Sequence, residues 1–299
     1  MQLILNDPIQ TPPVSHRRVN SKLGGAIVNR TSVFVFYWPS RNKVLVSLVD
    51  KHKPAFIRME VEDQENDKYE PFTGFAQLWT QWQLLDSLLP TGGFAHSFGL
   101  ESAVQARLVV LPEDLETYVI HVLQNTGSLL LPFIYTITIS PDEQAWHKLD
   151  KLLNATLTND VSRKASMSQG SALMRVAASV FSEIPSLKTM RSSALRNGDV
   201  AFHHAPVFGL VCALLGFAPE IAQRAYMFVT MRDIISAATR LNLVGPLGAA
   251  VLQHRIAPVA EELSKKWTNR GVDEACQVCP LLDIVHGCHG YLFSRLFCS

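Results

Sequence analysis

The chain has 299 residues, of which 47% are hydrophobic and 18% are charged, and its formal net charge is +1. This composition excludes a mainly disordered chain, because it offers enough apolar surface to bury a large core. The near-neutral charge provides no overall field that would attract nucleic acid or an anionic membrane. We therefore expect a folded protein without a nucleic-acid or membrane partner.

The first 58 residues differ in composition from the rest of the chain. They contain nine Lys or Arg residues and only two acidic residues. Residues 33–38 and 44–49 could pair as a hairpin, although two isolated strands are marginal in water. We predict an irregular basic extension over residues 1–58, which is a disordered segment, a targeting segment or the product of a mis-assigned start. An acidic linker over residues 59–74 follows it.

From Phe75 onward, the apolar residues recur at helical spacing. One helix is predicted to begin at Pro112, where the fixed φ angle and the missing N–H of proline suit a first turn. A second helix carries an apolar stripe from Ile221 to Ala238, which predicts a core-facing side. Further helices are predicted at residues 142–157, 160–182, 205–217 and 247–267. We predict an all-α fold, a single bundle of about ten helices over residues 75–271.

Two long uncharged stretches, residues 117–141 and 200–219, are candidates for membrane spans. Polar residues and prolines interrupt both, and the second is too short in its apolar part for the roughly 20 residues that a span requires. Buried core helices are the better interpretation. The five cysteines are odd in number and four lie in the last 24 residues, which favours reduced thiols and a cytoplasmic protein.

The C-terminal segment, residues 272–299, concentrates side chains that can ligate metals. Thiolates and imidazoles at such spacing could accept Zn²⁺ or Ni²⁺, but the segment lacks the second C-x-x-C or the H-x₃₋₅-H of a strong zinc motif. We assign no metal site and expect no tightly bound cofactor, although transient nickel binding stays open. The candidate ligands are Cys276, Cys279, His286, Cys288 and His289.

Two features raise the question of catalysis. Ser97 follows His96 in a string that is one substitution away from the G-x-S-x-G nucleophile elbow, but its flanks predict helix rather than the required strand. His203 and His204 precede an apolar helix and could line a metal path or start the helix. A metal-dependent or serine hydrolase using these residues is the alternative to a non-enzymatic role. The sequence has no G-x-x-x-x-G-K-[ST] string, so we expect no nucleotide hydrolysis by this chain.

Four strings in order along residues 75–299 resemble the urease accessory protein family UreF, in its plant-like form. Any one of them alone would be weak, but their order and the helical sequence between them are specific. They are Leu89-Pro90-Thr91-Gly92-Gly93-Phe94 with Ser97-Phe98-Gly99-Leu100-Glu101, Arg163-Lys164-Ala165-Ser166 with Gln169-Gly170, Ser236-Ala237-Ala238-Thr239-Arg240-Leu241, and Arg295-Leu296-Phe297-Cys298-Ser299.

The resemblance implies an all-helical, non-catalytic homodimer. Such a protein binds the accessory protein called UreD or UreH, recruits the GTPase UreG, and takes part in delivering Ni²⁺ to apo-urease. It also implies a C-terminal segment that docks on the UreD-type partner and becomes ordered there. Deleting residues 276–299 is then expected to abolish the complex while leaving the bundle folded.

The resemblance also implies roles for individual residues. Arg295 resembles the arginine that contacts the GTPase, and Phe94 occupies an aromatic position of the glycine turn. We expect partner contacts at Phe94, His96, Arg295, Leu296 and Phe297. The positions that match family motifs without an assigned contact are Gly92, Gly93, Ser97, Gly99, Glu101, Arg163, Ser166, Gly170, Ser236 and Arg240.

Overall fold

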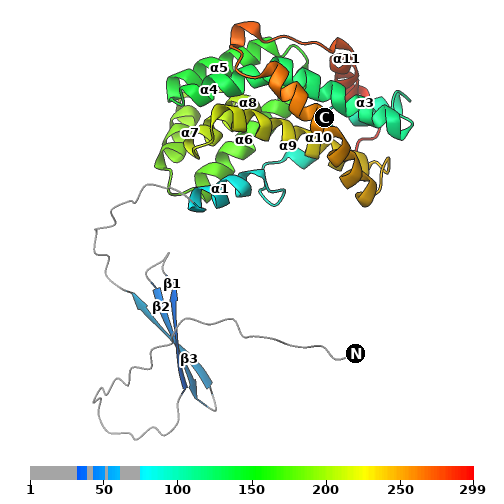
Figure 1. The fold of residues 1–299 in the computed structure, drawn as a ribbon. Coiled ribbons are helices and arrows are strands. Elements are labelled where there is room, and N and C mark those ends of the chain that lie inside the picture. Colours follow the sequence, from blue (N-terminus) through cyan, green and yellow to red (C-terminus); the bar gives the residue numbers. More distant parts are fainter. Residues whose placement is uncertain (1–31, 39–42, 51–52, 61–74) are drawn as a thin grey trace, which may run out of the picture. The chain divides into compact units, whose positions relative to one another are not determined.

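The computed structural model describes residues 32–38, 43–50, 53–60 and 75–299. The chain divides into two units, Met1–Glu70 and Pro71–Ser299. Figure 1 shows the elements of both units. The predictions of a disordered, targeting or mis-assigned segment and of the acidic linker fall largely outside the described residues.

The first unit contains three antiparallel strands in the order β1-β2-β3. They are β1 (Ser32–Trp38), β2 (Lys43–Asp50) and β3 (Lys53–Glu60). Val46 of β2 lies opposite Val35 of β1 on one side and Ile57 of β3 on the other. The hairpin that the sequence allowed is therefore present, and β3, which the sequence pattern does not predict, gives it a third strand. Three strands are the smallest sheet expected to be stable in water.

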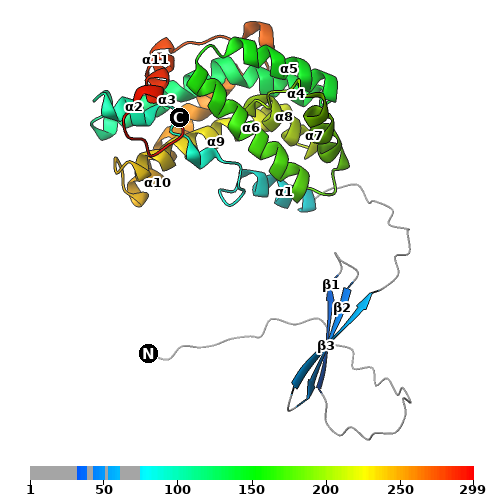
Figure 2. The same ribbon diagram turned by 180° about the vertical axis from the view of Figure 1, so that it is seen from behind.

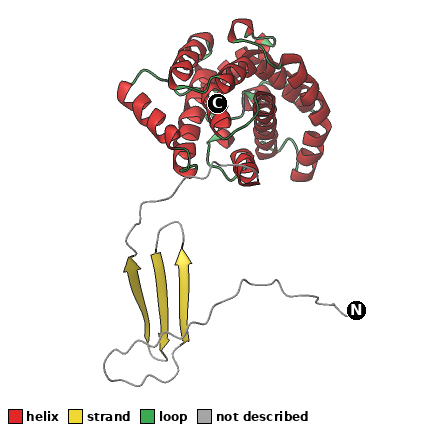
Figure 3. Cartoon of the chain, turned by 60° about the vertical axis from the view of Figure 1, so that its left-hand side comes forward, coloured by secondary structure: helices red, strands yellow, loops and turns green. Residues whose placement is uncertain are grey.

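In the second unit, the regular elements among the described residues are all helices joined by loops, as the sequence predicts (Figure 3). Short 3-10 and π turns join some of the helices. The helices are α1 (Phe75–Leu85), α2 (Leu100–Gln105), α3 (Pro112–Asn125), α4 (Leu131–Ile139), α5 (Glu143–Thr156), α6 (Asp160–Val180), α7 (Pro185–Asn197), α8 (His204–Leu214), α9 (Pro219–Arg240), α10 (Pro246–Trp267) and α11 (Pro280–Cys288).

Prolines and caps fix where the helices begin. Five helices start at a proline, where the missing N–H costs nothing because the first-turn amides have no helical acceptor. These are α3, α7, α9, α10 and α11. Helix α6 instead begins after Asn159, whose side chain accepts hydrogen bonds from the Val161 and Ser162 amides. The observed ends lie within three residues of those predicted for the helices around residues 142–267.

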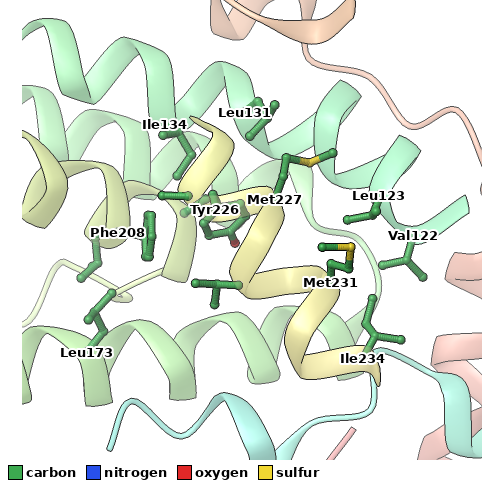
Figure 4. Packing of buried hydrophobic residues seen from close by; sticks show 14 of the residues in the cluster. Val122, Leu123, Leu131, Ile134, Leu173, Phe208, Tyr226, Met227, Met231 and Ile234 are labelled. Carbon is green, nitrogen blue, oxygen red and sulfur yellow. The ribbon is translucent and has the colours of Figure 1, made fainter. Parts of the chain in front are cut away.

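Helix α9 occupies the centre of the bundle, between α3, α4, α8 and α10 (Figures 1 and 2). Figure 4 shows its Met227, Met231 and Ile234 among apolar side chains of the surrounding helices. The sequence predicted one buried stripe on α9, but Ile221 and Phe228 of that stripe are 49% and 39% exposed. The correction has a simple cause: α9 is buried on most of its circumference, so periodicity alone misplaces its exposed strip.

One helical stretch in the described part of the chain, Pro112–Ile139, is long and apolar enough to cross a membrane, with a mean hydropathy of 1.2 over its most apolar window. It consists of α3, a π turn at Thr126–Leu130 and α4. In the structure, 61% of that window is buried inside the bundle. Core helices of folded proteins pass the same hydropathy test, and the burial matches the core position that the sequence favours.

The C-terminal segment packs on the bundle. The resemblance implied that residues 272–299 become ordered on a UreD-type partner, but in the isolated chain α11 already contacts α2 and α6. Phe297 is 5% exposed and Ser299 is 1% exposed. All three ribbon views place the C-terminal end against the helices (Figures 1, 2 and 3). The segment packs on the isolated chain because it buries apolar area there and forms hydrogen bonds with groups of the bundle.

Candidate functional site: the junction of the glycine turn with the C-terminal segment

The glycine turn, residues 89–94, lies in the tightly packed connection between α1 and α2. Gly92 has a φ angle of 81°, which a residue with a side chain adopts only with strain, and it leads into a 3-10 turn at Gly93–Ala95. Gly93 is buried, and a Cβ atom there would overlap the carboxylate of Asp233. Both glycines are therefore required by shape, which explains why the turn can lie directly on α9.

Arg232 and Asp233 of α9 pack against the glycine turn. Arg232 donates to Asp233 Oδ1 from Nε at 2.9 Å and from Nη2 at 2.8 Å, and to the Leu85 carbonyl from Nη1 at 2.6 Å. Its guanidinium also lies 5.3 Å from the centre of the Phe94 ring. Burial raises the pKa of Asp233, whereas the charge of Arg232 acts to lower it. The Arg232–Asp233 pair thus contacts the Phe94 ring from the interior of the bundle.

Arg240 joins the glycine turn to the C-terminal segment. Its guanidinium donates to the carbonyl of Phe94 and lies 4.3 Å from the centre of the Phe297 ring. A cation over an aromatic ring at this distance is attractive. Asp233 and Arg240 lie two turns apart on α9, but they do not pair with each other. Asp233 pairs with its neighbour Arg232, and Arg240 contacts Phe94 and Phe297 instead.

The last residue is held by the residues that follow the turn. The Ser97 amide and hydroxyl both donate to the carbonyl of Ser299, each at 2.7 Å. Nδ1 of His96 lies 2.8 Å from Oγ of Ser299. The Cys298 amide donates to the Ala95 carbonyl at 2.8 Å. Residues 95–97 thus bind the chain end much as a neighbouring strand would.

Glu101 is the buried acid of the junction, with 4% of its surface exposed. Its Oε2 lies 3.0 Å from Nε2 of His289 and accepts a hydrogen bond from the Phe297 amide at 3.1 Å. Its Oε1 accepts from the Leu296 amide at 2.6 Å. Charge-assisted hydrogen bonds of this kind are stronger than neutral ones. Gly99, with a φ angle of 79°, starts α2 where the His286 backbone leaves no room for a Cβ atom.

A cavity of about 140 Å³ lies where the C-terminal segment meets the bundle. His96, His204 and His286 line it together with Tyr226 and Gln169. Burial lowers the pKa of His96 and of His286 to about 4, with a further contribution from His289 in both cases. Burial lowers the pKa of His204 to about 3. The imidazoles are therefore neutral at pH 7.

The candidate metal ligands of the C-terminal segment are not brought together. Within the described residues, no group of three or more His, Cys, Asp or Glu side chains is arranged to hold a metal ion. Cys276 and Cys288 are exposed, while His289 is buried against Glu101. Cys279 contacts Oε1 of Gln124 through its sulfur, and burial raises the pKa of its thiol. His286 instead faces the cavity.

The family motif on α6, residues 163–170, contacts the start of α8 rather than the junction. Ser166 Oγ accepts from the His204 amide at 3.1 Å and lies 3.1 Å from Nδ1 of His203. Gly170 passes so close to the carbonyl of Phe202 that a Cβ atom would overlap it. Arg163 pairs with the carboxylate of Asp160 at 2.6 Å. Ser236, the remaining motif serine, lies half-buried on α9.

The geometry does not support the hydrolase alternative. Ser97 is fully buried, and its hydroxyl donates to a carbonyl rather than to a histidine. A serine nucleophile requires a base within hydrogen-bond reach and an exposed oxygen. His203 is also fully buried, and its ring atoms contact Ser166 Oγ and Asn154 Oδ1, the latter at 3.2 Å. These histidines anchor the start of α8.

The predicted partner contacts divide into two groups. Arg295 is exposed, Leu296 is 54% exposed and Phe94 is half-buried, so all three present some surface to a partner. His96 and Phe297 are 4% and 5% exposed. A partner contact of these two residues stays a prediction. In the isolated chain the C-terminal segment covers them, and both contribute to the junction from inside.

Sequence reasoning missed several residues that build the site. Asp150 is fully buried and accepts from the amides of Ala201 and His203, both at 2.6 Å, which fixes the approach to α8. The sequence does contain an indication of this burial, because Asp150 follows Trp146 by four residues and so lies on the apolar side of α5. Gln105 donates to the Ser294 carbonyl at 3.2 Å. Nothing in the local sequence marks Gln105, because its partner lies 189 residues away.

Comparison with known proteins places the chain in a family. A family model described as UreF matches residues 109–257. A protein of Arabidopsis thaliana named Urease accessory protein F is 66% identical over 238 residues, which cover 80% of this chain and 99% of that protein. A protein of the same name from Oryza sativa subsp. japonica is 66% identical over 222 residues, covering 74% of this chain and 85% of that protein. Urease accessory protein UreF of Mycobacterium tuberculosis is 30% identical over 216 residues, covering 72% and 96%.

The second unit is an all-helical bundle in which the C-terminal segment is part of the folded surface. The similarity to known proteins assigns this helical bundle to a family. The chain belongs to the UreF family of urease accessory proteins. The resemblance carried by the four sequence strings is confirmed.

Proposed function

We propose that this chain is a non-catalytic subunit in the maturation of urease. It binds a UreD/UreH-type protein, and together they recruit a UreG-type GTPase, so that GTP-dependent nickel delivery to apo-urease takes place on the assembled complex. Family membership supports the link to urease. The GTP chemistry belongs to the partner, because this sequence has no phosphate-binding lysine motif.

The observation that carries the proposal is the position of Arg295. Its side chain is exposed and has no hydrogen-bond or ion-pair partner among the described residues, while the backbone beside it is held by buried groups. A planar guanidinium that projects from a fixed backbone is suited to a carboxylate or a carbonyl on a partner. Arginine is also among the residues that contribute most to protein interfaces.

The surroundings of Arg295 add apolar area. Tyr291 is 92% exposed, Phe293 is fully exposed and Leu296 is 54% exposed. An arginine among exposed aromatic and aliphatic side chains is typical of a binding surface, since such patches are uncommon on parts of a protein that only face water. We assign this surface to the accessory proteins of the complex.

Several finer features belong to the same proposal. The chain acts as a homodimer in the cytoplasm, without nucleic-acid or membrane partners. Nickel is cargo of the complex rather than a resident cofactor, and any contact of nickel with this chain is transient. We expect the cysteine and histidine residues of the C-terminal segment to hold no resident metal ion; among the residues that the structure describes, they are not grouped as three or more ligands.

Reconstitution of the complex tests the proposal. The chain is mixed with purified UreD-type and UreG-type proteins, and the size and composition of the product are measured, followed by urease activation with added nickel. We expect a stable complex, which Arg295→Ala weakens without changing the helical circular dichroism. Arg196→Ala, an exposed arginine at the end of α7, is the matched control. Failure of the unmodified chain to form the complex with folded partners would reject the proposed function.

A further inference from the structure

Helix α2 lies directly under the part of the C-terminal segment that carries Arg295. Glu101 and Gln105 are four residues apart on this helix, and residues at that spacing share one face. Both side chains reach the C-terminal segment, and they reach it on opposite sides of Arg295. Gln105 binds the residue before it, and Glu101 binds the two residues after it.

The contacts fix the backbone rather than the side chain of Arg295. Nε2 of Gln105 donates to the Ser294 carbonyl at 3.2 Å, and the Leu296 amide donates to Glu101 Oε1 at 2.6 Å. The Phe297 amide donates to Oε2 of the same carboxylate at 3.1 Å. The peptide units on both sides of Arg295 are therefore tied to α2, while the guanidinium itself projects into solvent.

The carboxylate of Glu101 is in turn fixed within the bundle. His289 Nε2 lies 3.0 Å from its Oε2, and the two side chains are buried. The Phe297 ring, next to the amide that Glu101 binds, packs under the guanidinium of Arg240 at 4.3 Å. The Glu101 anchor and the Phe297 anchor are thus each supported by a further contact, with His289 and with Arg240 respectively, and such support holds a site in one geometry before its partner arrives.

We infer that Glu101 and Gln105 are positioning residues that present Arg295 to an acidic site on the partner GTPase. This inference rests on the proposed function and deepens it. A residue that is ordered before binding does not have to be ordered during binding, which improves affinity by about tenfold for each backbone unit held. The carboxylate of Glu101 does not touch the partner, because it is covered by the segment that it binds.

A double-mutant cycle tests whether Glu101 acts through Arg295. The dissociation constant for the GTPase is measured with the preformed complex of the full-length chain and its UreD-type partner. We expect Arg295→Ala and Glu101→Gln each to weaken binding by about tenfold. The combined variant should bind no more than about twofold more weakly than Arg295→Ala alone, because the two changes disable one contact. Independent, multiplying losses would overturn the inference.

A second variant protects the test against misfolding. Gln105→Ala removes only an exposed hydrogen bond, so it should leave the unfolding midpoint unchanged while weakening GTPase binding several-fold. Gln144→Ala on α5 and Glu113→Gln on α3, both exposed, are the matched controls and should bind normally. If Gln105→Ala and Glu101→Gln both bind as tightly as the unmodified chain, the inference is wrong.

Amide hydrogen exchange supplies a readout without any partner. The Leu296 and Phe297 amides should be protected in the unmodified chain and should lose protection in Glu101→Gln, while the Ala237 amide within α9 stays protected. Unprotected Leu296 and Phe297 amides in the unmodified chain would contradict the inference. If the unmodified complex does not bind the GTPase, the proposed function fails and the inference fails with it. If Arg295→Ala weakens binding and neither α2 variant does, only the inference fails.

Discussion

The carboxylate of Glu101 and the imidazole of His289 lie 3.0 Å apart in the interior, although 188 positions separate them in the chain. His289 is fully buried and Glu101 nearly so, with the amides of Leu296 and Phe297 completing the set of donors. A buried carboxylate is tolerated only when such partners replace its water. The pair therefore makes the C-terminal segment part of the fold, and the surface that carries Arg295 depends on it.

Arg240 is expected to stabilise the junction through two different contacts. Arg240→Ala removes the hydrogen bond to the Phe94 carbonyl and the interaction with the Phe297 ring, and it should lower the free energy of unfolding by about 1–2 kcal/mol. Arg240→Lys keeps the charge but not the planar fork, so it should recover only part of this loss. Urea unfolding followed by circular dichroism measures both, with Arg196→Ala as the control. Equal midpoints for all three variants would contradict the role.

Gly93 is expected to tolerate no side chain. In Gly93→Ala the added Cβ atom meets the carboxylate of Asp233, which is already bonded to Arg232, so the turn has to move away from α9. We expect a loss of about 1–3 kcal/mol in unfolding free energy, the usual cost of overpacking. Gly245→Ala is the matched control because its Cβ would meet nothing within 4 Å. A Gly93→Ala protein as stable as the control would show that the turn is looser than described.

The bundle was predictable from the sequence because helical periodicity and proline positions are local signals. Pro112 and the apolar residues that follow it gave the start and the buried face of α3, and the structure agrees. Helix α9 shows the limit of the same signal: Ile221 and Phe228 fit the predicted stripe yet face outward. A helix that neighbours surround on most sides has no single apolar face for the period to reveal.

The junction was only partly predictable, because most of its hydrogen bonds join residues 146 to 203 positions apart. The sequence strings named Glu101, Ser97 and Arg240, but no local pattern pairs Ser97 with Ser299 across 202 positions. The family resemblance implied a C-terminal segment that becomes ordered on its partner, so packing of this segment on the bundle was not predicted. Its anchoring depends on complementary polar groups of the bundle, and these can be matched only in three dimensions.

Acid is expected to destabilise the chain through its cavity histidines. The folded-state pKa values of His96, His286 and His204 are about 4, 4 and 3, below the ordinary value of 6.5. The unfolded chain therefore binds more protons, and stability is lost as the pH falls from about 6.5 toward 4. Each group can contribute on the order of 3 kcal/mol over that range. Urea midpoints at a series of pH values measure the effect.

The control for this pH dependence is a histidine outside the cavity. His286→Phe should flatten the profile because it removes one titrating group from the junction, whereas His121→Gln on the exposed side of α3 should leave it unchanged. Asp233, whose pKa burial raises, acts in the opposite direction and gives stability at low pH. A profile that His286→Phe does not alter would mean that His286 titrates normally and that the segment is not closed over it.

Removal of residues 276–299 is expected to destabilise the bundle as well as to abolish the complex. The resemblance alone predicted a bundle unaffected by this deletion, but the structure shows that the segment contacts the bundle through buried groups. The deletion exposes the Glu101 carboxylate and removes its hydrogen-bond donors on His289, Leu296 and Phe297. It also removes the buried Phe297 ring, whose burial alone contributes about 2 kcal/mol to the free energy of unfolding. The truncated chain should unfold at a lower urea concentration than the full chain. Arg295→Ala, which changes only an exposed side chain, should keep the original midpoint while losing GTPase binding. A truncated chain with an unchanged midpoint would show instead that the segment adds nothing to the fold and serves its partner alone.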